Sequence, residues 1–174
     1  MSPVADIPRR RFHVRLFAVV LTALGGTALA TAPAALGGRQ LLLNLSPSEA
    51  MGVYARVAAP LRAGEIVAFI PPAAARIPGV PKTSTFLKSV AAAPGDRVCR
   101  RGDVVSVNGS TVAAARKYDS HKHPLPQWMG CRRLLEGEYF LVSNVHPNSF
   151  DSRYYGPISI HSIIGVYRLV EIKL

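Results

Sequence analysis

Apolar residues in this chain form one long N-terminal run, followed by a series of short runs that end at proline, glycine or asparagine. Residues 16–36 contain no charged side chain, and a run of this length crosses a bilayer as a single helix. The shorter runs further along are typical of β-strands separated by turns. The pattern therefore predicts one N-terminal transmembrane helix and a mainly β domain.

Short apolar or alternating runs predict the individual strands. We expect them at Ile66–Ile70, Phe86–Ala93, Val104–Val107, Thr111–Ala113, Tyr139–Ser143 and Ile163–Ile172. The Asn108-Gly109 pair is the strongest hairpin signal, because these two residues adopt positive φ at low cost. The segments Pro71–Lys82 and Arg116–Gly130 are predicted to be loops, since no repeat or long helical periodicity crosses them.

Basic residues at the N-terminus predict the orientation of the anchor. Arg9, Arg10, Arg11 and Arg15 precede the apolar run, and such residues stay on the cytoplasmic side. We expect residues 1–15 to be cytoplasmic, 16–36 to be the transmembrane anchor and 37–174 to be a periplasmic domain at a bacterial inner membrane. A cleaved secretory signal is the alternative, because small residues of the kind found at cleavage sites occur at 28–34.

The net charge of +11 fits binding to an anionic surface. Residues 1–40 hold five arginines and one aspartate, which gives +4, so the remaining residues carry 16 basic and 9 acidic side chains, which gives +7. This excess is dispersed and suits contact with membrane lipid. No helix-turn-helix, zinc-finger or RNA-binding signature accompanies it, so nucleic acid is not an expected partner.

The two cysteines, Cys99 and Cys131, fit an oxidising compartment. A bond across this spacing would stabilise the fold by about 3 to 4 kcal/mol in the chain-entropy model, and we predict a disulfide. No metal site is expected, because His121 and His123 fall in no zinc-ligand pattern. We interpret the segment that contains them as a solvated loop.

Three polar stretches carry candidate chemistry. In the first, Ser48 lies in a Ser-Pro-Ser turn, where proline fixes the backbone and Gly52 permits a tight bend. In the second, Lys88 shares a strand face with Phe86 and Val90, so burial is expected to lower its pKa toward that of a general base. The third is the loop 148–156, where an aspartate and an arginine two residues apart can brace the backbone. The first two have structural alternatives: an ordinary turn for the first and a lysine that extends its charge to solvent for the second.

Together these stretches resemble the successive motifs of the type I signal peptidases. The motifs are Ser48 with Gly52 and Tyr54, the run 87–98 (LKSVAAAPGDRV) and the run 148–156 (NSFDSRYYG). Within this family the chain is most similar to the TraF-type conjugative transfer peptidases. The similarity lies in its short length, in the sequence of residues 44–54 and in the insert from Cys99 to Cys131. The resemblance covers about residues 44–174, and it implies a signal-peptidase-like β-sheet or barrel domain.

The resemblance also implies roles for individual residues in a serine–lysine protease without a cofactor. Ser48 would be the nucleophile, Lys88 the general base, Ser46 an oxyanion-hole hydroxyl beside the Ser48 amide, Ser149 a hydroxyl that orients the lysine, and Asp151 with Arg153 structural support. Two departures affect the shape of the substrate pocket: Ala50 stands where the family usually has proline, and residues 144–147 replace the usual glycine-aspartate-asparagine lead-in.

Three functions are consistent with these residues. The first is a membrane-anchored peptidase that matures an exported protein, in particular a conjugative pilin precursor, by hydrolysis or by cyclisation through the acyl-enzyme. The second is a general housekeeping signal peptidase. The third is a non-catalytic membrane-anchored β-domain that binds secretion-system components, and the joint presence of Ser48, Lys88 and Ser149 argues against it.

Overall fold

The structure is a computed structural model, and it describes residues 40–73 and 81–170. The predicted cytoplasmic segment 1–15 and anchor 16–36 lie outside these described residues. Within them, no helix has the length and apolar character needed to cross a membrane. Residues Leu41–Leu174 make up one compact unit.

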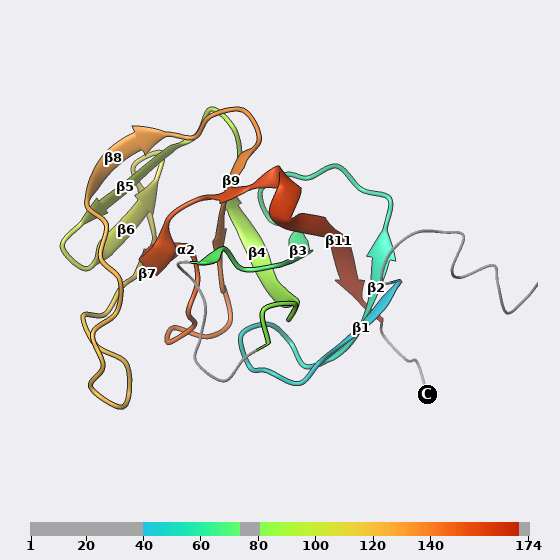
Figure 1. The fold of residues 1–174 in the computed structure, drawn as a ribbon. Coiled ribbons are helices and arrows are strands. Elements are labelled where there is room, and N and C mark those ends of the chain that lie inside the picture. The colour runs from blue at the N-terminus through green and yellow to red at the C-terminus, as the bar shows by residue number, and fades with distance from the viewer. Residues whose placement is uncertain (1–39, 74–80, 171–174) are drawn as a thin grey trace, which may run out of the picture. The chain divides into compact units, whose positions relative to one another are not determined.

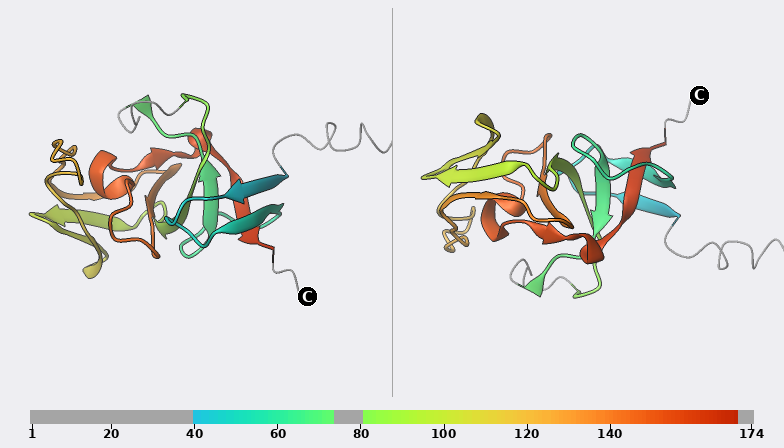
Figure 2. Two further views of the ribbon diagram at one scale, coloured as in Figure 1. Left: turned by 90° about the horizontal axis from the view of Figure 1, so that it is seen from below. Right: turned by 90° about the horizontal axis from the view of Figure 1, so that it is seen from above.

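The larger of two antiparallel sheets has the strand order β1-β2-β11-β3-β4-β9-β10 (Figure 1). Its strands are β1 (Leu41–Asn44), β2 (Gly52–Val57), β3 (Ile66–Phe69), β4 (Phe86–Ala92), β9 (Glu138–Val142), β10 (Ile158–Ser159) and β11 (Ile163–Leu169). Strand β11 follows all the others in sequence but pairs with β2 on one side and β3 on the other. Figure 2 shows β1, β2 and β11 side by side from two further directions.

The smaller sheet has the order β7-β6-β5-β8. Its strands are β5 (Arg97–Arg101), β6 (Val104–Val107), β7 (Ser110–Ala114) and β8 (Gly130–Arg133). Asn108 adopts the positive φ of 50° that the predicted hairpin requires, and Gly109 follows with 90°. The chain enters this sheet directly from β4 and leaves it into β9.

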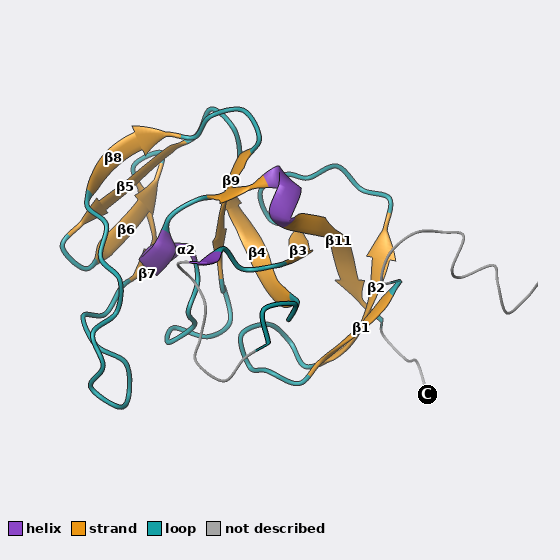
Figure 3. Cartoon of the chain, in the orientation of Figure 1, coloured by secondary structure: helices purple, strands orange, loops and turns teal. Residues whose placement is uncertain are grey.

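Helical structure among the described residues is confined to single turns (Figure 3). Helix α2 (Ser152–Tyr155) begins at Asp151, whose side chain accepts a hydrogen bond from the Arg153 backbone N–H. The 3-10 turn η2 (Ile160–Ser162) joins β10 to β11. The described part of the chain is therefore mainly β, as the sequence predicts.

Three apolar clusters hold the sheets together. The first joins the smaller sheet to β9 and α2 through Val98, Val105, Phe140 and Tyr154. The second covers β3, β4 and β9 and includes Phe69, Val90 and Leu141, and the third packs Tyr54 against Leu87 and Tyr167. Phe140 and Leu141 belong to different clusters, so β9 is buried on both faces. This burial holds β9 in place and thereby positions the segment that leads into the third motif.

Each predicted strand is present, with corrections at its ends. The strand expected at Tyr139–Ser143 ends at Val142, because the Ser143 N–H donates to Asp151 Oδ2 (3.0 Å) instead of to a neighbouring strand. The strand expected at Ile163–Ile172 ends at Leu169. Gly130, predicted as loop, begins β8, and residues 74–80 of the loop predicted at Pro71–Lys82 lie outside the described residues.

Candidate active site

The turn that holds Ser48 connects β1 to β2, which pair in register up to Asn44 opposite Gly52. The Asn44 side chain fills the turn: its Nδ2 donates to the carbonyls of Ser46, Glu49 and Ala50, each at 3.0 Å. Its Oδ1 accepts from the N–H and the hydroxyl of Ser46, both at 3.2 Å. A single buried amide thus fixes the path of the backbone around the candidate nucleophile, a role that the sequence pattern did not reveal.

The two serines of the turn lie side by side. Ser46 Oγ is 2.8 Å from Ser48 Oγ, and Ser48 is partly exposed. The turn closes at Gly52, whose φ of 145° is strained for any residue with a side chain. A Cβ added there would lie 2.8 Å from Leu169 Cδ1, so the Leu169 side chain would have to move. The bend that the sequence predicts at Gly52 is present.

Lys88 lies in the middle of the sheet, on β4, and is only 4% exposed. Its Nζ donates to the Leu87 carbonyl at 3.0 Å. Burial lowers the pKa of Lys88 to about 8, against the opposing charges of Asp151 and Glu49 and in the same direction as the charge of Arg153. The lysine is therefore buried and does not extend its amine to solvent.

The third motif is organised by a buried ion pair. Arg153 donates to both carboxylate oxygens of Asp151 at 2.8 Å, and both residues are almost completely buried. Arg153 also donates to the Pro147 carbonyl at 2.6 Å and to the Ala114 carbonyl at 3.2 Å. The pair joins α2 to the loop that carries Ser149.

Ser149 itself is buried, and its Oγ has no hydrogen-bond partner among the described residues. The Lys88 amine donates to Leu87 and not to Ser149 in this structure. The role of Ser149 in orienting the lysine stays a prediction. The Tyr155 hydroxyl is likewise buried without a hydrogen-bond partner in the described part of the chain, and burial raises its pKa well above 10.

Two long-range hydrogen bonds bring the three stretches together. The Ser143 hydroxyl, directly after β9, donates to the Ser48 carbonyl. The Ser89 hydroxyl, next to Lys88 on β4, donates to Glu49 Oε1 at 3.1 Å. The turn of the candidate nucleophile is thus bonded to the strand of the candidate base and to the segment that leads from β9 into the third motif.

Glu49 and Ser143 make contacts that the sequence does not predict. Nothing in their local sequence marks them, because a glutamate in a polar turn and a serine at a strand end are ordinary on a surface. Burial distinguishes them in the structure: Glu49 is 3% exposed and Ser143 is 7% exposed.

Cys99 and Cys131 are disulfide-bonded across directly opposite positions of β5 and β8. The loop between β7 and β8 folds back onto the third motif, where Trp128 Nε1 donates to the Ser152 carbonyl at 3.2 Å. Arg100, fully buried on β5, donates to the Arg153 carbonyl at 2.9 Å. The disulfide therefore anchors the end of a loop that supports α2.

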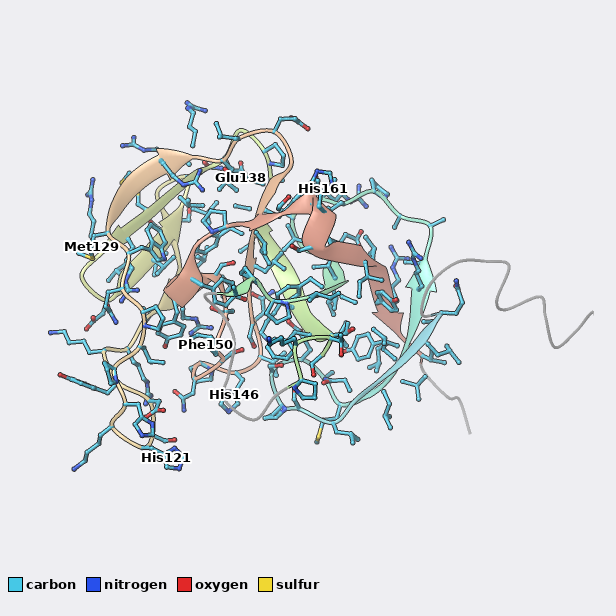
Figure 4. All side chains as sticks on the ribbon, in the orientation of Figure 1. His121, Met129, Glu138, His146, Phe150 and His161 are labelled. Carbon is cyan, nitrogen blue, oxygen red and sulfur yellow. A yellow bond between two sulfur atoms is a disulfide. The ribbon has the colours of Figure 1, made fainter. Side chains whose placement is uncertain are left out.

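His121 lies at the tip of that loop (Figure 4), and His123 Nδ1 contacts Asp119 Oδ2 at 3.0 Å. Both histidines are exposed. Among residues 40–73 and 81–170, no three histidine, cysteine, aspartate or glutamate side chains gather in a way that would hold a metal ion.

Comparison with known proteins places these observations in context. A family model described as "Signal peptidase, peptidase S26" matches residues 9–171. The chain is 35% identical to the plasmid transfer protein TraF of Escherichia coli over 84% of its own length and 90% of that protein. It is 30% identical to signal peptidase I V of Bacillus subtilis over 49% of its own length and 57% of that protein.

Among solved structures, the chain is similar to a signal peptidase I from Enterococcus faecalis. The sequences are 25% identical, the match covers 63% of this chain and 97% of that one, and the TM-score is 0.39.

Proposed function

Since this chain belongs to the signal peptidase family, peptidase S26, and is a signal peptidase-type serine protease, we propose that it uses Ser48 and Lys88 to remove a leader segment from an exported protein. The observation that carries the proposal is the buried Lys88, on a strand that is hydrogen-bonded to the Ser48 turn through Ser89 and Glu49. A lysine so placed supplies a base without a histidine.

The pKa of Lys88 makes this chemistry feasible near neutral pH. With a pKa of about 8, about one molecule in ten carries a neutral amine at pH 7, against about one in three thousand for an unperturbed lysine. The neutral amine takes the proton of the Ser48 hydroxyl as its oxygen attacks the scissile carbonyl. The same proton then passes to the leaving amine, which leaves an acyl-enzyme on Ser48.

The turn supplies donors for the tetrahedral intermediate. The Ser48 backbone N–H and the Ser46 hydroxyl form the proposed oxyanion hole, where one donor contributes about 3 kcal/mol to transition-state stabilisation. Asn44 holds the Ser46 backbone and hydroxyl in place. Because the Ser46 hydroxyl donates its one hydrogen to Asn44 Oδ1, it must turn from Asn44 toward the substrate before it can donate to the oxyanion.

Ser149 is proposed to orient the amine of Lys88. Its buried hydroxyl has no hydrogen-bond partner in the described residues, which favours a partner that arrives during the reaction. The ion pair between Asp151 and Arg153 fixes the loop that carries Ser149.

The proposed substrate is a precursor of a conjugative pilin. The similarity to TraF proteins named for plasmid transfer, which extends over most of both chains, supports this choice. The acyl-enzyme is resolved either by water or by the substrate's own amine, and the second route gives a cyclic product.

Intact mass of the product tests the proposal. Candidate pilin precursors are incubated with the full-length protein in membranes, with Ser48→Ala as the matched control. A product that appears only with wild type supports the assignment, and a mass one water lower than the hydrolysed product identifies cyclisation. Cleavage by Ser48→Ala at the wild-type rate would refute it.

A housekeeping signal peptidase is the second candidate, favoured by the similarity to signal peptidase I V of Bacillus subtilis. Ordinary secretory precursors are added to the same assay. Efficient cleavage of a broad set of them, with no preference for pilin precursors, would favour this candidate over the first.

The proposed location is the periplasmic face of the bacterial inner membrane. Large apolar side chains around the Ser48 turn are exposed, among them Leu45 at 75% and Met51 at 68%, and the charge of +7 beyond residue 40 favours anionic headgroups. A form that begins at Gly38 is expected to cleave short peptides normally but embedded precursor slowly, with partial rescue by anionic lipid. Equal rates for the two forms on embedded precursor would contradict membrane placement.

A further inference from the structure

Glu49 is the acidic residue next to the proposed nucleophile, and it points into the protein. Its side chain is 3% exposed, although it belongs to a turn whose other residues are exposed or partly exposed. Its Oε1 accepts a hydrogen bond from Ser89 Oγ at 3.1 Å, and Ser89 is itself 3% exposed. A carboxyl group is buried only at a cost in free energy, so a turn glutamate folded inward requires an explanation.

The position of Glu49 connects the two reactive groups. It follows Ser48 in sequence, and its partner Ser89 follows Lys88. One side-chain hydrogen bond therefore joins the residue after the nucleophile to the residue after the base, across forty positions of sequence. A shift of either segment relative to the other would stretch this bond.

The charges around Glu49 also concern Lys88. Glu49 and Asp151 are the two carboxylates that raise the proton affinity of Lys88, while burial and Arg153 lower it. Burial raises the pKa of Glu49, and Ser89 and Lys88 act in the opposite direction. Burial raises the pKa of Tyr54, on β2, and the charge of Glu49 raises it further.

We propose that Glu49 is a positioning residue of the active site, which holds the Ser48 turn on β4 through Ser89 and sets, by its negative charge, the pH at which Lys88 acts. The inference rests on the proposed roles of Ser48 and Lys88. Asp151 is committed to its ion pair with Arg153, so Glu49 is the carboxylate left to respond to the protonation of the lysine.

Two substitutions separate the hydrogen bond from the charge. Glu49→Gln keeps an oxygen that accepts from Ser89 but removes the charge, so the acidic limb of the profile of kcat against pH moves to lower pH with little loss at the new optimum. Ser89→Ala removes the hydrogen bond and keeps the charge. We expect it to lower kcat at least about tenfold through misplacement of the nucleophile, with the limb near its wild-type position.

Two controls complete the set. Glu49→Ala removes both functions and combines the two effects. Glu136→Gln makes the same chemical change at an exposed position and leaves kcat and the pH profile at their wild-type values.

A second measurement does not depend on catalysis. The protein is treated with acetic anhydride over a range of pH, and acetylation of the Lys88 peptide is followed by mass spectrometry in wild type, Glu49→Gln and Glu136→Gln. Only a neutral amine reacts, so the midpoint is expected to move to lower pH in Glu49→Gln alone.

The outcomes distinguish this inference from the proposed function. If Lys88→Arg still cleaves, the lysine is not the base, and both fall. If Lys88→Arg is inactive while Glu49→Gln matches Glu136→Gln in both titrations, the proposed function stands and the charge role of Glu49 is overturned. If Ser89→Ala keeps wild-type kcat, the positioning role is overturned.

Discussion

Replacing Lys88 with methionine is expected to make the folded protein more stable at neutral pH while abolishing cleavage. Methionine has a similar length and no charge, and the site is 96% buried, since Lys88 is 4% exposed. In the wild type the ammonium group is held in a place that disfavours it. Burial lowers its pKa from the ordinary value of 10.5 to about 8, so the folded state binds this proton less tightly than the unfolded state does.

The size of the effect follows from that difference in pKa. A folded-state pKa below the unfolded one means that the penalty is complete below the folded value and disappears as pH rises to the unfolded value. A difference of about 2.5 units corresponds to about 3 kcal/mol at pH 7. Between pH 8 and 10.5 the unfolded chain still holds the proton and the folded chain does not, so the wild type gains stability across that range relative to Lys88→Met.

Urea unfolding of both proteins between pH 6 and 10.5 measures this difference. The stability advantage of Lys88→Met should be constant below pH 7 and should decrease by about 3 kcal/mol by pH 10.5. Lys82→Met, at an exposed lysine, is the control and should show no such trend. A difference between Lys88→Met and wild type that does not change with pH would refute the argument that the buried amine titrates near neutral pH.

Three further results are expected. Lys88→Arg should keep the fold but lose cleavage, because arginine stays protonated at any usable pH; residual activity near wild type in a peptide assay would remove the lysine from the mechanism. Reduction of the Cys99–Cys131 bond should lower the free energy of unfolding by about 3 to 4 kcal/mol, seen as a lower urea midpoint, and two free thiols in protein isolated from the periplasm would contradict both the bond and the assigned compartment. Asp151→Asn should destabilise by about 3 to 5 kcal/mol, because it leaves the Arg153 guanidinium buried without its partner; a change below about 1 kcal/mol in the same unfolding assay would show that the ion pair does not hold the loop.

Strands with continuous apolar runs could be predicted from the sequence, because the apolar residues of such a strand indicate by themselves that it is buried. β3 is an example, and the Asn108-Gly109 turn identifies the β6–β7 hairpin through its backbone requirement. Strands β1, β2, β5, β8 and β10 were missed. Among these, β5 and β8 are rich in arginine, and Arg100 points inward to donate to Gly102 and Arg153 carbonyls, which breaks the expected alternation of polar and apolar positions.

In the candidate site, too, features set by nearby residues could be predicted, and features set by distant partners could not. The burial of Lys88 follows from its apolar neighbours on a strand, and the Asp151–Arg153 pair follows from their spacing. Glu49 and Ser143 could not be predicted, because each acts through a partner far away in sequence: Ser89 for Glu49 and the Ser48 carbonyl, 95 residues away, for Ser143. Local patterns contain no information about such pairs.

The place of β11 in the larger sheet has a consequence for when the enzyme becomes active during its own synthesis. The ribosome makes the β1–β2 hairpin with Ser48 first and the β3–β4 hairpin with Lys88 soon afterwards, but β11 is the strand that lies between them. Until residues 163–169 have been made and have inserted, the two hairpins share no backbone ladder. A chain that is still being translated therefore carries Ser48 and Lys88 without the strand that joins their hairpins, and we expect its proteolytic activity to begin only after translation of the last strand.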